Sequence, residues 1–283
     1  MTAASHPPDR EHQGPLAPTL AALPGDPRLA IDRLASLGYR HVQLSARQAG
    51  MRPREMDRSA RRGLLASLNR REIEPAGLDA WIPVRQFTDP AQADRALAAL
   101  LEAIDLAADL GRIPVSVNLP RPAGDSSEST NAASAASVLS ISELLDVLLS
   151  RAAHLGVMLA DHRVPRASEP VAPPGAGEPD HPHALGIDPP AWLAADRDPV
   201  EAITTAGSAL ASARLVDLLT TGMRGPVGDH SEGQLDLTAY RIALSVSGYE
   251  RPVVVDARQW IDPWAGLEQS AHAWRHATPA GMP

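Results

Sequence analysis

Apolar and polar positions along the chain alternate between two patterns that together predict an α/β protein. Short apolar runs bounded by loops indicate buried strands at 16–22, 41–45, 74–79, 113–119, 157–161, 184–188, 213–218 and 252–256. Segments with apolar residues at helical spacing lie between them, and the longest covers about 90–110. Eight strands alternating with helices in about 250 residues predict a single (β/α)8 barrel. An open doubly wound sheet is the alternative, which the lack of a Gly-rich dinucleotide turn disfavours.

Capping residues predict where the helices begin and end. Asp-Pro occurs at 26–27, 89–90, 198–199 and 262–263, and Asp at the N-cap followed by Pro is a typical helix start. Ser140 and Glu143 have the spacing of a capping box, and a further helix is expected at 236–247. Glycines at 38, 111, 156 and 207 are expected to end four of these helices.

The barrel is expected to occupy residues 15–276 as one domain. Residues 1–14 and 277–283 are expected to be disordered tails. Two stretches, 121–139 and 163–183, are rich in small, polar or proline residues and predict long loops. Each follows a strand, so both loops are expected at the end of the barrel where the strands finish.

Four of the predicted strands end in aspartate, at Asp161, Asp188, Asp217 and Asp256. The carboxyl ends of parallel strands meet at one end of a barrel, and active sites are found at that end in nearly every known case. The sequence therefore predicts a gathering of carboxylates there.

Composition excludes several kinds of chemistry. The 283 residues contain no cysteine, and all 26 Lys+Arg residues are arginine, which excludes thiolate nucleophiles, Cys-ligated metals and lysine Schiff bases. A formal net charge of −8 without a basic, aromatic-rich stripe disfavours nucleic acid as a partner. No apolar stretch approaches a membrane span and no signal-type segment begins the chain, so no membrane partner and a cytoplasmic location are expected.

Several segments, taken in order, resemble xylose isomerase-like TIM barrels of the sugar phosphate isomerase/epimerase type. The first is a helix followed by Leu-Gly-Tyr and a strand, at 34–44. The others lie at 103–111, 185–188, 214–217, 227–236 and 248–256. The resemblance covers roughly residues 28–275, and it depends on the order of the motifs because no single motif is specific.

The resemblance implies one divalent metal (Mn, Mg, Co or Zn) held by residues at the ends of the last four strands. The implied ligands are His162, or Asp161 if the strand shifts by one residue, together with Asp188 and Asp256. Arg214 occupies the position of the family's histidine ligand. A guanidinium cannot ligate a cation, so either the metal site is lost or Arg214 neutralises the acids or binds an anion in its place.

Each implied site residue also has an ordinary structural explanation. Asp188 could instead cap a helix before its two prolines, His162 could hydrogen-bond a loop, and Asp256 could form a plain salt bridge with Arg258. Asp217 matches a position expected to be structural.

Further side chains near strand ends are candidates for contacting a substrate. Gln43 and Asp79 could reach hydroxyl groups, and Trp81 could stack on a sugar ring or pack at the barrel mouth. Arg258 could clamp the substrate, and Arg224, after the seventh strand, could bind phosphate. Arg52 and Arg54, after the second strand, could hold an anion, although simple exposure is expected for Arg54.

The first functional hypothesis is a sugar or sugar-phosphate isomerase or epimerase. His162, Asp188 or Asp256 would move a proton next to a carbonyl, and a metal or Arg214 would stabilise the oxyanion. The alternative is a catalytically degenerate barrel that serves as a carbohydrate-binding or scaffold protein. A nuclease of the endonuclease IV kind ranks last, because it needs several zinc ligands and a basic face. A small sugar or sugar phosphate is the expected partner, and a homo-oligomer is compatible with the sequence.

Overall fold

Eight short parallel strands form the centre of the structure, as the sequence predicts. The computed structural model describes residues 15–121, 139–178, 181–228 and 232–277. Neighbouring strands follow the order β1-β10-β7-β6-β5-β4-β3-β2, and every pair is parallel. The strands are β1 (Leu16–Pro18), β2 (His41–Ser45), β3 (Glu74–Asp79), β4 (Val115–Val117), β5 (Leu159–Asp161), β6 (His183–Ile187), β7 (Leu210–Leu215) and β10 (Val253–Val255).

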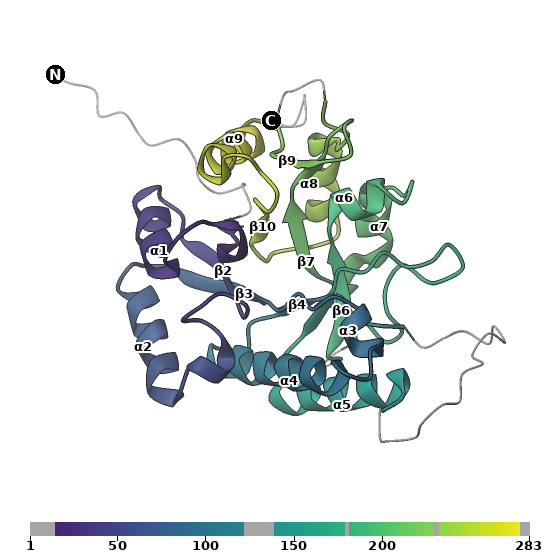
Figure 1. Ribbon diagram of the computed structural model, residues 1–283. Helices are drawn as coiled ribbons and strands as arrows, with labels where there is room; N and C mark the ends of the chain where they lie inside the picture. Colours follow the sequence, from purple (N-terminus) through teal and green to yellow (C-terminus); the bar gives the residue numbers. More distant parts are fainter. Residues whose placement is uncertain (1–14, 122–138, 179–180, 229–231, 278–283) are drawn as a thin grey trace.

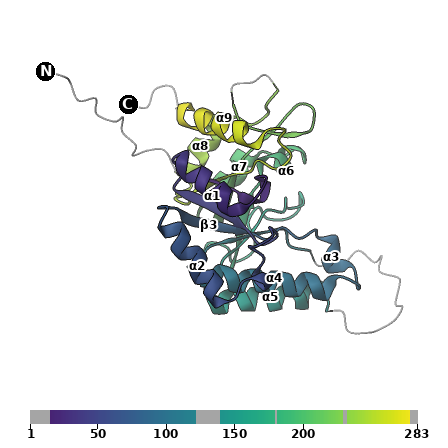
Figure 2. The same ribbon diagram turned by 60° about the vertical axis from the view of Figure 1, so that its left-hand side comes forward.

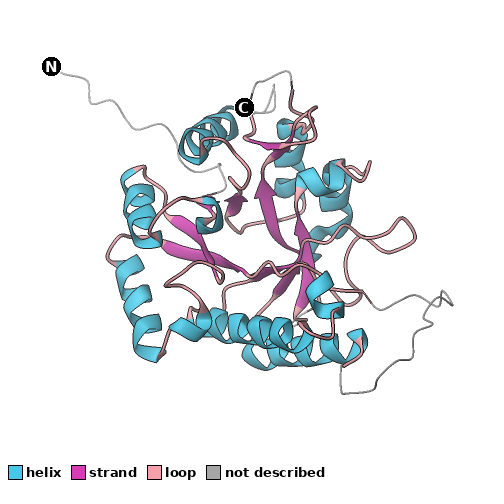
Figure 3. Cartoon of the chain, viewed as in Figure 1, coloured by secondary structure: helices cyan, strands magenta, loops and turns pink. Residues whose placement is uncertain are grey.

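Helices surround these strands on the outside of the barrel (Figures 1 and 3). They are α1 (Pro27–Ser36), α2 (Arg58–Asn69), α3 (Arg85–Thr88), α4 (Ala93–Asp109), α5 (Ile141–Leu155), α6 (Pro189–Leu193), α7 (Pro199–Ala206), α8 (Leu237–Val246) and α9 (Pro263–His276). Helices α4 and α5 run side by side, on the side of the barrel away from α9 (Figure 2). Among the described residues, no helix is both long enough and apolar enough to span a membrane.

The barrel closes between its first two strands through a single bridge. Thr19 pairs with Gln43 in parallel, and the Thr19 amide donates to the Val255 carbonyl at 3.0 Å.

The predicted first strand, at 16–22, is too long. It ends at Pro18, and Leu20–Ala22 form a 3-10 helix that the Thr19 side chain caps.

Two other predicted boundaries are also wrong. The long helix begins at Ala93 rather than after Asp89, because Asp89 ends the short helix α3 and its carboxylate accepts from the Ala91 amide within a turn. The seventh strand begins at Leu210, and Asp217 belongs to a separate antiparallel pair, β8 (Asp217–Leu218) with β9 (Arg224–Gly225).

The other predicted caps are confirmed. Asp26, Asp198 and Asp262 each accept a hydrogen bond from the first turn of α1, α7 and α9, and Ser140 and Glu143 form the capping box of α5. Residues 163–178, the described part of the stretch expected to form a long loop, contain no helix or strand. Both predicted tails, apart from Ala277, and most of the 121–139 loop lie outside the described residues.

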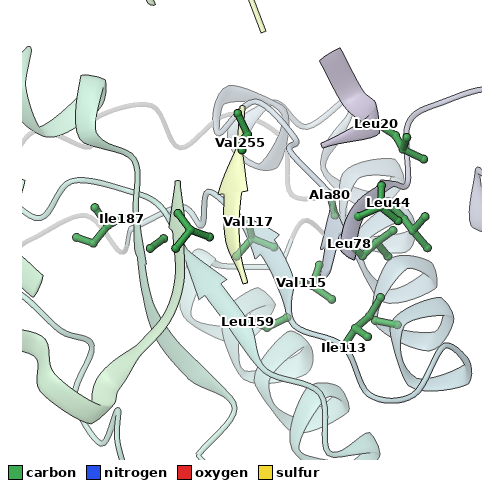
Figure 4. Close-up of a cluster of buried hydrophobic side chains, with 14 of the residues drawn as sticks. Leu20, Leu44, Leu78, Ala80, Ile113, Val115, Val117, Leu159, Ile187 and Val255 are labelled. Carbon is green, nitrogen blue, oxygen red and sulfur yellow. The ribbon is translucent and has the colours of Figure 1, made fainter. Parts of the chain in front are cut away.

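Alternate residues of each strand face the helices and form the main apolar core. On β4, Val115 and Val117 pack with Leu78 of β3 and Leu159 of β5 in this layer (Figure 4). All four are almost completely buried. Because successive side chains of a strand point to opposite faces, the residues between them must face the barrel interior. Complete burial of such an aliphatic side chain contributes about 1.5–3 kcal/mol to folding.

Small and polar side chains occupy much of the barrel interior. Ala160, Ala184 and Ala211 form a small apolar cluster there. Beside it, Gly186 of β6 makes room for the ring of His162, because a Cβ on Gly186 would lie 2.6 Å from the Cδ2 atom of His162. A glycine on β6 is therefore what allows an imidazole inside the barrel.

Substitution of Gly186 by alanine is expected to lower the free energy of unfolding by about 1–3 kcal/mol, because the added methyl group overpacks a buried ring. Urea unfolding measures the change. Gly63→Ala is the control, because Gly63 lies inside α2 with nothing within 4 Å of its added Cβ. That variant should gain about 0.5–1 kcal/mol through helix propensity. Equal effects of the two substitutions would contradict this account of Gly186.

Candidate functional site

Charged side chains from four strand ends meet at the carboxyl end of the barrel. Asp79 is the last residue of β3, Asp188 follows β6, Asp256 follows β10, and Arg214 lies near the end of β7. Each is on the inward-facing side of its strand, and each is buried. The parallel register brings these four side chains together, although long sequence separations divide them.

Arg214 is the central group of this arrangement. Its side chain is 1% exposed, and it donates to Asp256 Oδ2 at 3.0 Å and to Asp79 Oδ1 at 3.2 Å. The buried hydroxyl of Tyr240 on α8 donates to the Arg214 carbonyl at 2.8 Å, which fixes the backbone of β7 at this point. Arg214 therefore connects the ends of three strands.

Two further arginines complete the arrangement. Arg224 donates to both carboxylate oxygens of Asp188, at 2.9 and 3.0 Å, and to Asp256 Oδ2 at 2.9 Å. Arg258 donates to both oxygens of Asp256 and lies 3.5 Å from Asp79 Oδ1. We call these six residues the arginine–aspartate cluster; its members are Asp79, Asp188, Arg214, Arg224, Asp256 and Arg258. Three guanidinium and three carboxylate groups give it no net formal charge.

The carboxylates of the cluster differ in how easily they ionise. Burial alone would raise the pKa of Asp256, but Arg214 and Arg258 outweigh this effect and hold that pKa well below its usual range. Burial raises the pKa of Asp79, although Arg258 and Arg214 partly oppose the rise. Asp256 is therefore the firmly ionised anion of the pair.

Trp81 covers part of the cluster with its aromatic face. The guanidinium carbons of Arg214 and Arg258 lie 5.0 and 5.3 Å from its ring centroid, within cation–π range. Trp81 is partly exposed, as are Arg224 and Arg258, with side-chain exposures of 16% and 26%. These three side chains are the parts of the site that an arriving molecule could touch.

His162 belongs to a second, uncharged network inside the barrel. Its Nε2 atom lies 3.2 Å from Ser116 Oγ, which accepts a hydrogen bond from Gln43 Nε2 at 3.0 Å. Burial, followed by the positive charges of Arg214 and Arg258, lowers the pKa of His162 well below its ordinary value. His162 is therefore a neutral, buried ring that does not contact the carboxylates directly in any hydrogen bond between described residues.

The register shows which of His162 and Asp161 faces the barrel interior, a question that the sequence left open. His162 lies inside the barrel, whereas Asp161 lies on the other face of its strand, where it accepts from the amides of Leu119 and Arg163. Asp217 has the structural role expected for it, because its Oδ1 accepts from the amides of Gln234 and Leu235. His230, a loop histidine, lies outside the described residues.

The contacts of two aspartates in the cluster also test their alternative structural explanations, namely helix capping for Asp188 and a salt bridge for Asp256. Asp188 stands at the N-cap of α6 but makes no side-chain capping bond, and its carboxylate binds Arg224 instead. Asp256 does form the salt bridge with Arg258. Sequence reasoning missed Ser116 and Tyr240. For Ser116, the alternation Val-Ser-Val at 115–117 was a usable signal, because it places one polar residue on the inner face.

Comparison with solved structures finds whole-chain similarity to barrels of one kind. A xylose isomerase domain protein from Planctomyces limnophilus matches with a TM-score of 0.66 and 16% identity over 94% of this chain and 97% of that one. D-Psicose 3-epimerase with D-tagatose from Clostridium cellulolyticum H10 matches with a TM-score of 0.61 and 13% identity, over 92% and 99% of the two chains. A xylose isomerase-like TIM barrel protein from Mycobacterium smegmatis in complex with magnesium matches with a TM-score of 0.59 and 15% identity, over 94% and 97%.

The fold is that of the xylose isomerase-like TIM barrels. No protein-family model matches the chain, and no curated protein matches it significantly. The sequence motifs of the resemblance and the three-dimensional similarity therefore agree on the fold, while the identities are too low to transfer an activity.

The residues at the metal position of this xylose isomerase-like barrel do not suit a divalent cation. Both oxygens of Asp188 accept from Arg224, and Asp256 accepts from Arg214, Arg224 and Arg258. Arg214 offers no lone pair and would repel a cation. The described part of the chain contains no group of three or more His, Asp or Glu side chains that could hold a metal.

Lowering the pH is expected to reduce the free energy of unfolding, because Asp256 becomes protonated. Its pKa is lowered in the folded state, so its stabilising contribution is complete above the unfolded value of about 4 and is lost as the pH falls further. The free energy of unfolding, measured with urea between pH 6 and 2, should therefore fall with decreasing pH. Asp256→Asn should show a shallower fall.

Asp79→Asn provides the control within the same cluster. The pKa of Asp79 is raised, so its protonation in acid favours the folded state, and its removal should not flatten the fall in stability. If both variants changed the pH dependence equally, the assignment of the low pKa to Asp256 would be wrong.

Proposed function

We propose that the protein binds a small sugar or sugar phosphate at the carboxyl end of its barrel and does so without a resident divalent metal. It would thus be a carbohydrate-binding barrel with the architecture of sugar isomerases and epimerases but with altered chemistry at the centre. The observation that carries this proposal is Arg214, a buried guanidinium where the family resemblance implies a metal-binding histidine. The positive charge of the metal is supplied by side chains instead.

The accessible groups of the site suit a polyhydroxylated or anionic ligand. Trp81 offers a partly exposed aromatic face on which the apolar face of a sugar ring can stack. Arg224 and Arg258 are the partly exposed cations of the cluster, and guanidinium groups bind carboxylate and phosphate bidentately. Gln43 and Asp79 are buried, so we expect them to position other groups rather than contact the ligand first.

The same geometry argues against ready proton abstraction in the ligand-free protein. A general base works best when its pKa lies near the working pH. Asp256 is held far below that range, and His162 is buried and neutral with a strongly lowered pKa. The oxygens of Asp188 are occupied by Arg224. Binding is therefore better supported than catalysis.

A metal-independent isomerase or epimerase is the second candidate. Arg258, which is partly exposed beside Trp81, could stabilise the oxyanion of an enediolate, and the buried Arg214 would add positive charge behind it. A ligand anion that draws Arg224 or Arg258 toward itself would free carboxylate oxygens of Asp188 or Asp256 to act as a base. The similarity in fold to an epimerase crystallised with D-tagatose favours the same reaction class.

Binding of sugar phosphates is expected to need Trp81 but no metal. Fructose 6-phosphate serves as the probe in isothermal titration calorimetry, with and without EDTA, alongside metal analysis after incubation with Mn²⁺ or Co²⁺. No stoichiometric metal and no effect of EDTA are expected. Trp81→Ala should weaken binding about fivefold or more, as the loss of an aromatic contact implies.

Trp264→Ala is the matched control for this experiment. Trp264 on α9 also stacks with an arginine, Arg33 at 4.0 Å, but it lies outside the barrel mouth. The Trp264→Ala variant should therefore bind fructose 6-phosphate as the wild type does. Stoichiometric metal required for binding would overturn the proposal.

Turnover decides between the two candidates. Incubation with fructose 6-phosphate in D2O, followed by proton NMR, detects exchange of the hydrogen next to the carbonyl. A pure binding protein gives no exchange, which is the expected result. Exchange that is lost in Asp256→Asn, while binding persists, would establish the isomerase or epimerase candidate instead.

A further inference from the structure

A cavity of about 410 Å³ adjoins the barrel mouth on the side of β2 and β3. Ala46 and Ala80, which directly follow the ends of these two strands, line it, and the Ala46 amide donates to the Asp79 carbonyl at 2.9 Å. Trp81 also lines it. Trp81 therefore belongs both to the lining of the cavity and to the surroundings of the arginine–aspartate cluster.

The cavity is strongly basic in a chain that is acidic overall. Four arginines line it, namely Arg47, Arg52, Arg54 and Arg95, against one carboxylate, Glu102. The whole chain has a formal net charge of −8. The four positive charges around this cavity repel each other, and an anion bound between them would reduce the repulsion.

Most of these arginines form no ion pair in the described part of the chain, although Arg47 acts electrostatically on Asp79 and Arg54 on Glu55. Arg52 forms an ion pair with Glu55 at 2.8 Å, whereas no ion pair involves Arg47, Arg54 or Arg95 among the described residues. Arg47 is held at the cavity wall by donating to the Trp81 carbonyl at 3.0 Å. By contrast, every arginine of the cluster is already bonded to carboxylates.

We propose that this cavity is an anion subsite that binds the phosphate group of a sugar phosphate whose sugar contacts Trp81. The proposal rests on the proposed function and specifies where the charged end of its ligand is bound. Barrels commonly bind phosphate through the loops after the last two strands. Here Arg224, on that side, is committed to Asp188 and Asp256, and the unpaired cations lie after β2 and along α4. The volume lies within the range of sites for small molecules.

The test compares three probes by isothermal titration calorimetry, namely inorganic phosphate, fructose 6-phosphate and fructose. The cavity variant is Arg54→Gln/Arg95→Gln, which changes two exposed side chains. The control variant is Arg62→Gln/Arg251→Gln, which removes the same charge from exposed positions that do not line the cavity. Circular dichroism checks that both variants fold.

The cavity variant is expected to bind inorganic phosphate and fructose 6-phosphate at least about tenfold more weakly, since charge-assisted hydrogen bonds are lost. Its binding of fructose should not change, and the control variant should match the wild type with all three probes. Fructose 6-phosphate should bind more tightly than phosphate to the wild type, which identifies the phosphate as part of a sugar ligand. Equal affinities would indicate a site for free phosphate.

Two results would overturn the subsite. One is a wild-type protein that does not bind phosphate, and the other is equal weakening in the cavity and control variants, which would indicate a general charge effect. The outcome is separable from that of the proposed function. Fructose 6-phosphate binding that depends on Trp81 but not on Arg54 and Arg95 would remove the subsite alone. Fructose 6-phosphate binding that depends on these arginines but not on Trp81 would remove the sugar site alone.

Discussion

A fully buried guanidinium is the constraint on which the rest of the barrel mouth depends. Transfer of a charged group out of water costs several kcal/mol even after relaxation, so Arg214 can persist only with carboxylates placed around it. Asp79 and Asp256 supply them, and Asp188, Arg224 and Arg258 complete a cluster with no net formal charge. The aspartates at the strand ends are therefore required by charge compensation, whatever ligand the site binds. Each of the three carboxylates in the cluster consequently has an arginine partner.

Most of the fold could be predicted from local patterns because each strand and cap is specified within a few residues. The apolar runs at 41–45 and 74–79 are strands with the predicted ends, and Asp26 and Asp198 cap the predicted helices. The helix predictions that differ from the structure also have local causes. Asp89 lies between two helices, α3 and α4, so its Asp-Pro pair ends one helix rather than starting the next. Helix α2 was missed, although Asp57 caps it, because arginines and Gly63 interrupt its apolar face.

The members of the site could be named from the sequence, but their partners could not. Pairing in this cluster joins residues 36, 42 and 135 positions apart, and such contacts depend on how the sheet closes rather than on any local pattern. The inward or outward direction of a side chain changes with a shift of one residue, which is why Asp161 and His162 remained alternatives. The structure places Ala160 inside the barrel, and His162 follows it by two positions on the same face.

Guanidinium groups at the barrel mouth favour different ligands from those that a metal ion would favour. A metal accepts lone pairs from sugar hydroxyl and carbonyl oxygens, whereas a guanidinium donates hydrogen bonds and prefers an anion. Any such anion must compete with Asp188 and Asp256 for Arg224 and Arg258, and both pairs are already well formed. Apart from Arg52, the arginines around the neighbouring cavity form no ion pair with the described residues. A ligand with a sugar at Trp81 and its negative charge in that cavity would therefore bind without breaking the ion pairs that hold the barrel mouth together.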